Sequence, residues 1–212
     1  GTTEKMQQLI FASRPELKGN IYIAYCPERV LPGNVMYELV ENDRVIGGID
    51  KTSTQKAISF YSKYVKGELH ATNARTAEMC KLVGNSSRDV QIAFANEISL
   101  ICDKPNINVC ELINLANKHP RVNILQPGCG VGGHCIAVDP WFIVSQDPLN
   151  SRLIKTARVV NDNKPEWVVK QIQEEAEKRN TKNIACLGLA FKPDIDDLRE
   201  SPAISVVDSL LK

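Results

Sequence analysis

Residues 44–72 carry the sequence RVIGGIDKTSTQKAISFYSKYVKGELHAT, which alternates between two kinds of secondary structure. The apolar run at 44–49 predicts a strand, the amphipathic stretch at 52–65 predicts a helix, and residues 68–72 predict a weaker strand. Strands that alternate with helices of this length are typical of a parallel α/β sheet. A stable open sheet averages about five or six strands. Residues 21–25 add only one more, so the sheet is predicted to be partial.

Most of the remaining chain favours helices. Thr3 caps a predicted helix that ends at Ser13, and prolines break residues 26–33 into a loop. A helix without proline is predicted from Asn73 to about Cys102. Further helices are predicted at 109–117, 149–161 and 164–179, a buried strand at 183–189, and a last helix from Ser201 to the end of the chain. Between them, residues 119–140 have no helical or strand period, and an ordered loop of this length is usually functional.

The composition excludes several classes of function. The 212 residues include 26 Lys and Arg against 25 Asp and Glu, a net charge of +1, so no basic surface for nucleic acid or membranes is expected. The longest apolar run, about eight residues at 184–191, is far shorter than a membrane helix. The first residues lack a secretory signal. The seven cysteines have no Cys-x-x-Cys pair, which predicts no metal site and free thiols in a reducing cytoplasm.

The glycine-rich loop has two interpretations. Gly128, Gly130 and Gly133 match the spacing of a dinucleotide fingerprint, but no helical period follows to receive a pyrophosphate. The favoured interpretation is that the glycines allow a close backbone approach and hold Cys135 in a tight turn. Cys135 is the candidate nucleophile, with a small buried hydrophobe as the alternative. The adjacent His134 would point to the opposite side of an extended segment, which makes it a poor activating base.

Cationic groups form the other candidate sites. Lys81, Asn85 and Arg88 recur at i, i+4 and i+7 on the predicted long helix, a row that suits an oxyanionic ligand or is simply a solvated stripe. The segment 26–33, CPERVLPG, follows a strand at the end where α/β sheets bind ligands. Lys192 and Arg199 flank an acidic loop. Each of these last two clusters, taken alone, is interpreted as surface charge.

Four motifs in order give the chain a resemblance to the UDP-glucose/GDP-mannose dehydrogenase family. They are Cys-Pro-Glu-Arg-Val-Leu-Pro-Gly at 26–33, Ala-Glu-x-x-Lys-x-x-x-Asn at 77–85, Gly-Gly-His-Cys at 132–135 with Asp139-Pro140, and the run at 188–202 from Gly-Leu-Ala-Phe-Lys to Glu-Ser-Pro. His119-Pro-Arg121 and Gly-Gly-His-Cys resemble the N-acetylmannosamine branch. The resemblance implies oxidation of a UDP-sugar C6 alcohol to a carboxylate by two NAD⁺.

The family implies a role for each matching residue. Cys135 would form a thiohemiacetal and then a thioester, and Lys81 would stabilise charge at the reacting oxygen. Asn85 and Asp139 would orient water and the lysine, and Glu28 would serve the hydrolysis. The remaining implied contacts, all to ligands, are Arg29, Val30, Arg88, His119, Arg121, Gly132 and Lys192 for the nucleotide sugar and Arg199 for NAD.

The resemblance also implies the domain organisation. Residues 1–74 would be the C-terminal part of an NAD-binding Rossmann-like domain with a partial parallel sheet. Residues 75–163 would be a central helical domain that forms a homodimer, and 164–212 the start of a second, UDP-sugar-binding Rossmann-like domain. Family members begin with a strand, a true glycine fingerprint and a helix, so the chain is expected to be a central fragment that binds NAD poorly and is inactive alone.

Several alternatives remain open. The sugar could be UDP-glucose or UDP-N-acetylglucosamine, because a few contacts decide such specificity. The chain could be a non-catalytic remnant that dimerises or binds nucleotide sugars. A cysteine hydrolase using Cys135 with His119 or His134 is a further possibility, for which the sequence has no orienting third group.

Overall fold

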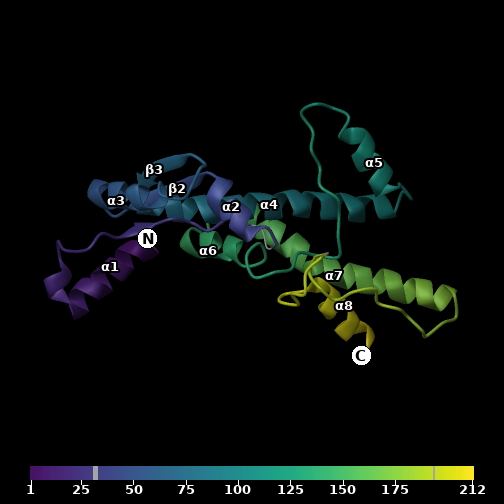
Figure 1. Cartoon of the computed structure of the whole chain (residues 1–212). Coiled ribbons are helices and arrows are strands. Elements are labelled where there is room, and N and C mark those ends of the chain that lie inside the picture. Colours follow the sequence, from purple (N-terminus) through teal and green to yellow (C-terminus); the bar gives the residue numbers. More distant parts are fainter. Residues whose placement is uncertain (31–32, 193) are drawn as a thin grey trace. The chain divides into compact units, whose positions relative to one another are not determined.

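The computed structural model describes residues 1–30, 33–192 and 194–212 and divides into two compact units. The first unit is Gly1–Val83 and the second is Gly84–Lys212. Helix α4 (Ala74–Asp103) is continuous across the boundary between them (Figure 1). Leu31, Pro32 and Pro193, which belong to two of the four motifs, lie outside the described residues.

The first unit contains a three-stranded sheet. The strands β1 (Ala24–Tyr25), β2 (Arg44–Gly48) and β3 (Leu69–Asn73) lie in that order. β2 and β3 are parallel, with Arg44 opposite Leu69, and helix α3 (Lys51–Tyr61) connects them. This confirms the predicted parallel α/β unit. β1 differs from the prediction, since it is only two residues long and pairs antiparallel with the last two residues of β2.

The Gly-Gly-Ile-Asp sequence fixes the junction between β2 and α3. A Cβ on Gly48 would lie 2.4 Å from the backbone nitrogen of Thr54, so only glycine allows this approach. The Gly48 N–H donates to Thr54 Oγ1 at 2.9 Å. Asp50 caps the helix by accepting a 2.7 Å hydrogen bond from the Ser53 N–H. The fully buried Ile46 of β2 lies in the core of this unit.

Three more helical segments belong to the first unit: α1 (Thr2–Ser13), the 3₁₀ helix η1 (Pro15–Leu17) and α2 (Val35–Glu41). α1 ends where the sequence predicts. At its start the backbone N–H groups of Thr2 and Thr3 donate to the Glu78 carboxylate at 3.1 and 2.6 Å. α2 follows the proline-broken loop and was not predicted.

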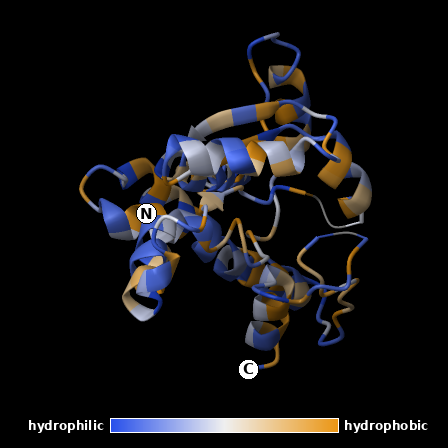
Figure 2. Ribbon diagram, turned by 60° about the vertical axis from the view of Figure 1, so that its left-hand side comes forward, coloured by the Kyte–Doolittle hydropathy of each residue, from blue (hydrophilic) through white to orange (hydrophobic). Residues whose placement is uncertain are grey.

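In the second unit the regular secondary structure of the described residues is helical, with α5 (Val109–Ala116), α6 (Asp139–Gln146), α7 (Arg152–Lys178) and α8 (Pro202–Leu210) following α4. α7 packs against both α6 and α8. The predicted long helix, the helix after it and the last helix are therefore confirmed. None of the described helices is long and apolar enough to span a membrane, and Figure 2 shows hydrophilic and hydrophobic residues alternating along the helices.

Three local predictions in the second unit are wrong. The segments 149–161 and 164–179 form the single helix α7, in which Pro165 is accommodated. Pro140 does not prevent a helix, because it lies in the first turn of α6, where a missing N–H costs nothing. Residues 183–189 do not form a buried strand: Leu187 is 98% exposed. A strand needs a neighbour for its backbone groups, and the described part of this unit offers none.

Candidate active site

Cys135 lies in a series of turns that leads directly into α6. Its side chain is half-buried, and its carbonyl oxygen accepts hydrogen bonds from the Val138 N–H at 3.1 Å and the Asp139 N–H at 2.8 Å. Asp139 is therefore both the first residue of α6 and a direct backbone partner of the cysteine. A short turn of this kind fixes the thiol and the carboxylate on one rigid element.

Asn85 connects this element to the long helix. Its side-chain nitrogen donates to Asp139 Oδ2 at 2.6 Å. Asp139 is only 8% exposed, and a buried carboxylate needs such a donor. Three of the sequence-predicted residues, Asn85, Asp139 and Cys135, are thus brought together by the structure, although the first two are 54 positions apart.

The glycines of the loop allow a second segment of the same chain to pack against it. A Cβ on Gly132 would lie 2.5 Å from the Glu200 carbonyl oxygen, and Gly133, at φ +85°, would collide with the Phe191 ring. The Gly133 N–H donates to the Arg199 carbonyl oxygen at 3.0 Å. The close approach predicted for these glycines is therefore made by the protein itself. Phe191 and the Glu200 backbone fill the space beside these two glycines.

Arg199 belongs to the segment that packs against the cysteine loop, and its guanidinium is paired within that segment. Its guanidinium binds the Asp197 carboxylate at 2.6 Å and lowers the pKa of that carboxyl to about 2. The hydrogen bond to Asp197 raises the pKa of Arg199, and the nearby Cys135 thiol contributes to the same shift. Lys192 is half-buried in the same segment. The structure thus places a guanidinium near the candidate nucleophile.

The other predicted residues of the second unit are more exposed. Arg88 lies exposed on α4, and His119 and Arg121 lie exposed in the loop after α5. The His119 ring nitrogen Nδ1 accepts from the Arg121 N–H at 3.3 Å. Lys81, in the first unit, is half-buried on α4 four residues before Asn85.

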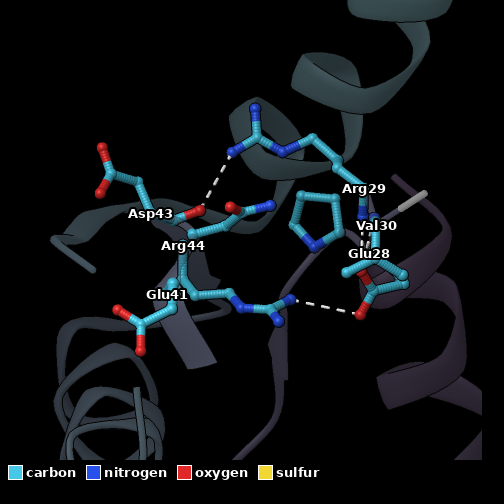
Figure 3. A pocket seen from close by; sticks show the side chains of 8 residues that line it. Glu28, Arg29, Val30, Glu41, Asp43 and Arg44 are labelled. Carbon is cyan, nitrogen blue, oxygen red and sulfur yellow. Dashed lines mark hydrogen bonds and ion pairs between the residues drawn. The ribbon is translucent and has the colours of Figure 1, made fainter. Parts of the chain in front are cut away.

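Glu28, Arg29 and Val30 line a cavity of about 470 Å³ in the first unit (Figure 3). Glu28 Oε1 accepts from the backbone N–H groups of Arg29 at 2.7 Å and Val30 at 2.9 Å. Its second oxygen, Oε2, accepts from Arg44 Nη1 at 3.2 Å. Partial burial acts to raise the pKa of Glu28, but the three hydrogen bonds together lower it by more. The pKa of Glu28 therefore lies below its usual value. The carboxylate is held ionised as an acceptor.

Sequence reasoning missed Arg44. The residue is 5% exposed and its Nη2 also donates to the Leu39 carbonyl oxygen at 3.0 Å. The signal was present, since an arginine begins an otherwise apolar strand. A charged side chain at the start of a buried strand needs a partner of opposite charge. For Arg44 that partner is the Glu28 carboxylate.

A buried polar row between α4 and α7 was also missed. The side chains of Asp89, Asn96, Arg158 and Asn161 are all 0 or 1% exposed. Asp89 and Asn96 are seven residues apart on the long helix, which places them on the same face. Two polar residues at this spacing in an otherwise apolar stretch were the signal in the sequence.

The fold and the loop define an α/β protein in which a half-buried cysteine is joined through its backbone to a residue with a buried carboxylate. The chain belongs to the UDP-glucose/GDP-mannose dehydrogenase family. Residues 1–65 match the NAD binding domain of that family, 75–163 its central domain and 185–212 its UDP binding domain.

Named relatives agree with this assignment. The UDP-N-acetyl-D-mannosamine dehydrogenase of Campylobacter jejuni is 61% identical over 218 residues, which cover 99% of this chain and 54% of that protein. The enzyme of the same name from Escherichia coli K12 is 58% identical and is covered to 53%. The chain therefore spans about half the length of the curated relatives it matches.

Solved structures give the same result. The UDP-D-ManNAc dehydrogenase of Pyrococcus horikoshii superposes with a TM-score of 0.89 at 43% identity, over 100% of this chain and 52% of that one. An NDP-N-acetyl-D-galactosaminuronic acid dehydrogenase from Methanosarcina mazei Go1 has a TM-score of 0.88 at 31% identity, over 100% of this chain and 49% of that one.

Proposed function

We propose that this chain is the central half of an NAD-dependent UDP-N-acetyl-D-mannosamine 6-dehydrogenase. The observation that carries the proposal is the Cys135 turn, whose backbone is bonded to Asp139 while the Asp139 carboxylate is bonded to Asn85. The names of the most similar relatives support the choice of sugar. The competing sugars are UDP-glucose and UDP-N-acetylglucosamine.

In the proposed reaction Cys135 carries the covalent intermediates. The C6 alcohol loses two electrons to become an aldehyde, and the Cys135 sulfur adds to its carbonyl carbon to give a thiohemiacetal. Loss of two more electrons gives a thioester, which water hydrolyses to the carboxylate and the free thiol. NAD⁺, when bound, accepts each pair of electrons.

Proposed roles for the other catalytic groups follow from their chemistry. Lys81 supplies an ammonium that stabilises the developing oxyanion. Asn85 holds the Asp139 carboxylate, and Asp139 in turn orients water and the lysine. Glu28 serves the hydrolysis, for which its ionised carboxylate is a suitable acceptor of a proton from water.

Binding roles are proposed for the remaining predicted residues. Arg29 and Val30 line the Glu28 cavity, where the Arg29 guanidinium is a cationic donor for a nucleotide sugar. The same role is proposed for Arg88, His119, Arg121, Gly132 and Lys192. Arg199 stays a proposed NAD contact, with its pairing to Asp197 and its position near Cys135 as competing uses of the guanidinium.

The described residues do not form a complete NAD site. A dinucleotide pyrophosphate binds at a glycine turn between a strand and a helix N-terminus. The one glycine-rich loop, 128–133, is instead packed by Phe191 and Pro202. The N-terminal N–H groups of α1 are taken by the Glu78 carboxylate. We therefore propose that the 212-residue chain alone binds NAD poorly and produces no measurable NADH.

We propose the domain limits 1–74, 75–163 and 164–212, with a homodimer formed through the long helix. α4 exposes Met79, Val83, Phe94 and Ile101, which helical geometry places on one stripe. An exposed apolar stripe of this length is typical of a subunit contact. The seven free cysteines support a cytoplasmic enzyme, and a place in polysaccharide biosynthesis is proposed from the nature of the sugar acid.

The test uses the full-length protein that contains this chain. With UDP-N-acetylmannosamine and NAD⁺, it should release two NADH per sugar acid formed. UDP-glucose and UDP-N-acetylglucosamine should react more slowly. Cys135→Ala should abolish acid formation, whereas Cys110→Ala, at an exposed cysteine outside the loop, should not. Full activity of Cys135→Ala, or a faster reaction with either competing sugar, would refute the corresponding assignment. UDP-sugar binding without any turnover would favour the non-catalytic remnant.

A further inference from the structure

A continuous row of hydrogen bonds runs through the buried contact between α4 and α7. Arg158 Nη1 donates to Asp89 Oδ1 at 2.6 Å, and Asn161 Nδ2 donates to the same oxygen at 2.8 Å. Asn96 Nδ2 then donates to Asn161 Oδ1 at 2.9 Å. The row ends outside the helices, where the Gly128 N–H donates to Asn96 Oδ1 at 2.8 Å. Gly128 is the first glycine of the Cys135 loop.

The direction of the row is fixed at one end. An Asp89 carboxylate facing the Arg158 guanidinium can only accept, so the Asn161 amide must turn its nitrogen toward it. The Asn161 oxygen is then presented to Asn96, and the Asn96 oxygen is left for the Gly128 N–H. Each amide both accepts and donates, and such rows polarise one another in a low-dielectric interior. Rotation of either amide would bring two oxygens together.

Packing alone does not account for these residues. Burying polar and charged groups is costly unless all of them are bonded, and apolar side chains of similar size would join two helices without that cost. A second branch reinforces the same point of α4: Lys164 Nζ donates to Ser99 Oγ at 2.6 Å, and Ser99 Oγ donates to the Asn96 carbonyl oxygen at 2.6 Å. Unlike apolar packing, the polar row also holds the backbone of one loop residue, Gly128, by a hydrogen bond.

Within the described part of the second unit, that hydrogen bond to Gly128 is one of the attachments of the segment 128–135. The Gly128 N–H is held by Asn96, the Gly133 N–H by the Arg199 carbonyl oxygen, and the Cys135 carbonyl oxygen by the start of α6. The Asn96 attachment holds Gly128, the residue at which the glycine-rich part of the loop begins. A residue that fixes this point limits where the following seven residues can lie.

We infer that Asn96 and Asn161 are positioning residues, which hold the Cys135 loop through a directed row of hydrogen bonds that begins at Asp89 and ends at Gly128. The catalytic consequence rests on the proposed function of Cys135, whereas the row itself does not. The inference predicts that a change at Asn161, whose side chain is bonded to Asp89 and Asn96, alters the environment of Gly128 and Cys135.

The row is tested first in the unchanged 212-residue chain by NMR. The side-chain amide protons of Asn96 and Asn161 should exchange with solvent far more slowly than those of Asn150, whose amide lies at the surface. A scalar coupling across the hydrogen bond should connect the Gly128 amide to the Asn96 side-chain carbonyl. Rapid exchange at Asn96 and Asn161, or no coupling to Gly128, would overturn the inference without any variant.

The transmission is tested with Asn161→Leu. The Gly128 amide should exchange at least about tenfold faster, the effect of losing one supported hydrogen bond. Alkylation of the half-buried Cys135 by iodoacetamide, followed by peptide mass spectrometry, should accelerate relative to the exposed Cys110. The matched control is Asn117→Leu, because Asn117 clamps the backbone of Ile124 in the same loop with bonds of 2.9 and 2.8 Å but lies outside the row. It should accelerate exchange at Ile124 and leave Gly128 unchanged.

The outcomes separate the two proposals. A general loss of structure would accelerate all amides of α7 together, which would show a merely structural role and overturn the inference. A Cys135 alkylation rate equal to that of the unchanged chain would overturn the positioning role even if Gly128 became faster. Neither result bears on whether Cys135 is the nucleophile, which depends on sugar oxidation by the full-length Cys135→Ala variant.

Discussion

The side-chain amide of Asn85 donates a 2.6 Å hydrogen bond to the Asp139 carboxylate and so ties α4 to the first turn of α6. The Asp139 N–H is bonded in turn to the Cys135 carbonyl oxygen. One side chain of the long helix is therefore two hydrogen bonds away from the backbone of the candidate nucleophile. Its energetic weight can be measured without any substrate.

The Asn85–Asp139 pair should show strong coupling in a double-mutant cycle. Asn85→Ala, Asp139→Ala and the double variant should give a coupling free energy of about 1.5–3 kcal/mol in urea unfolding, because the acceptor is a largely buried carboxylate. The control is the exposed pair Asp147 and Asn150, joined at 2.8 Å, whose coupling should stay below about 0.5 kcal/mol. Equal coupling in both pairs would contradict the importance of burial.

The parts of the fold that were predicted correctly depend on local sequence. The strand at 44–48 and the helix that follows it need only neighbours within a few residues. α6 was missed because Pro140 was taken as a break, although the first helical turn tolerates proline. The prediction of a strand at 183–189 was wrong because a strand needs a neighbouring strand for its hydrogen bonds. The pattern within one segment cannot show whether such a neighbour exists.

The candidate site divides in the same way. Asn85, Asp139 and Cys135 were identified through motifs; the structure joins them by hydrogen bonds, and their catalytic roles stay predictions. Arg44 and Asn161 were missed because the role of each depends on a partner residue whose position in space cannot be inferred from the sequence. Glu28 is 16 positions from Arg44, and Asn96 is 65 positions from Asn161. Only the three-dimensional fold brings such pairs together.

Arg44→Met should destabilise the chain more at neutral than at acidic pH. The lowered pKa of Glu28 means that its ionised contacts stabilise the fold above the unfolded pKa of about 4.3, and this stabilisation is lost as the pH falls through the folded value. The loss of melting temperature should therefore be larger near about pH 7 than near about pH 3.

The control for Arg44 is Arg29→Met in the same cavity. The Arg29 guanidinium donates to the Asp43 carbonyl oxygen at 3.4 Å, which does not titrate, and its electrostatic effect on the exposed Asp43 carboxylate is the smallest of those that lower the pKa of that group. Its loss should be small and nearly independent of pH. If Arg44→Met costs the same melting temperature at both pH values, the ion pair with Glu28 is not what holds this arginine.

Phe94→Glu should weaken self-association of the full-length protein. Phe94 is 51% exposed in the apolar stripe of α4, and a charge placed in a subunit contact must be desolvated. Sedimentation velocity should show a shift toward monomer, with the melting temperature of the monomer little changed. Gln91→Glu, at an exposed polar position of the same helix, is the matched control and should sediment like the unchanged protein. A dimer that tolerates Phe94→Glu would place the contact elsewhere.

Lys164→Met should remove a pH-dependent loss of folding free energy that the buried Lys164 ammonium causes in α7. Burial lowers the pKa of Lys164 to about 8, although its Nζ donates to Ser99 and lies 3.9 Å from the Trp167 ring centroid. Between about pH 8 and about pH 10.4 the unfolded lysine keeps a proton that the folded one has lost, so this group makes the fold more stable as pH rises. Compared with the unchanged chain, Lys164→Met should gain about 1–3 kcal/mol more at neutral pH than at about pH 10 in urea unfolding. Lys155→Met, at an exposed position of the same helix, should show no such difference, and a pH-independent gap for Lys164→Met would mean that the buried ammonium is not destabilised.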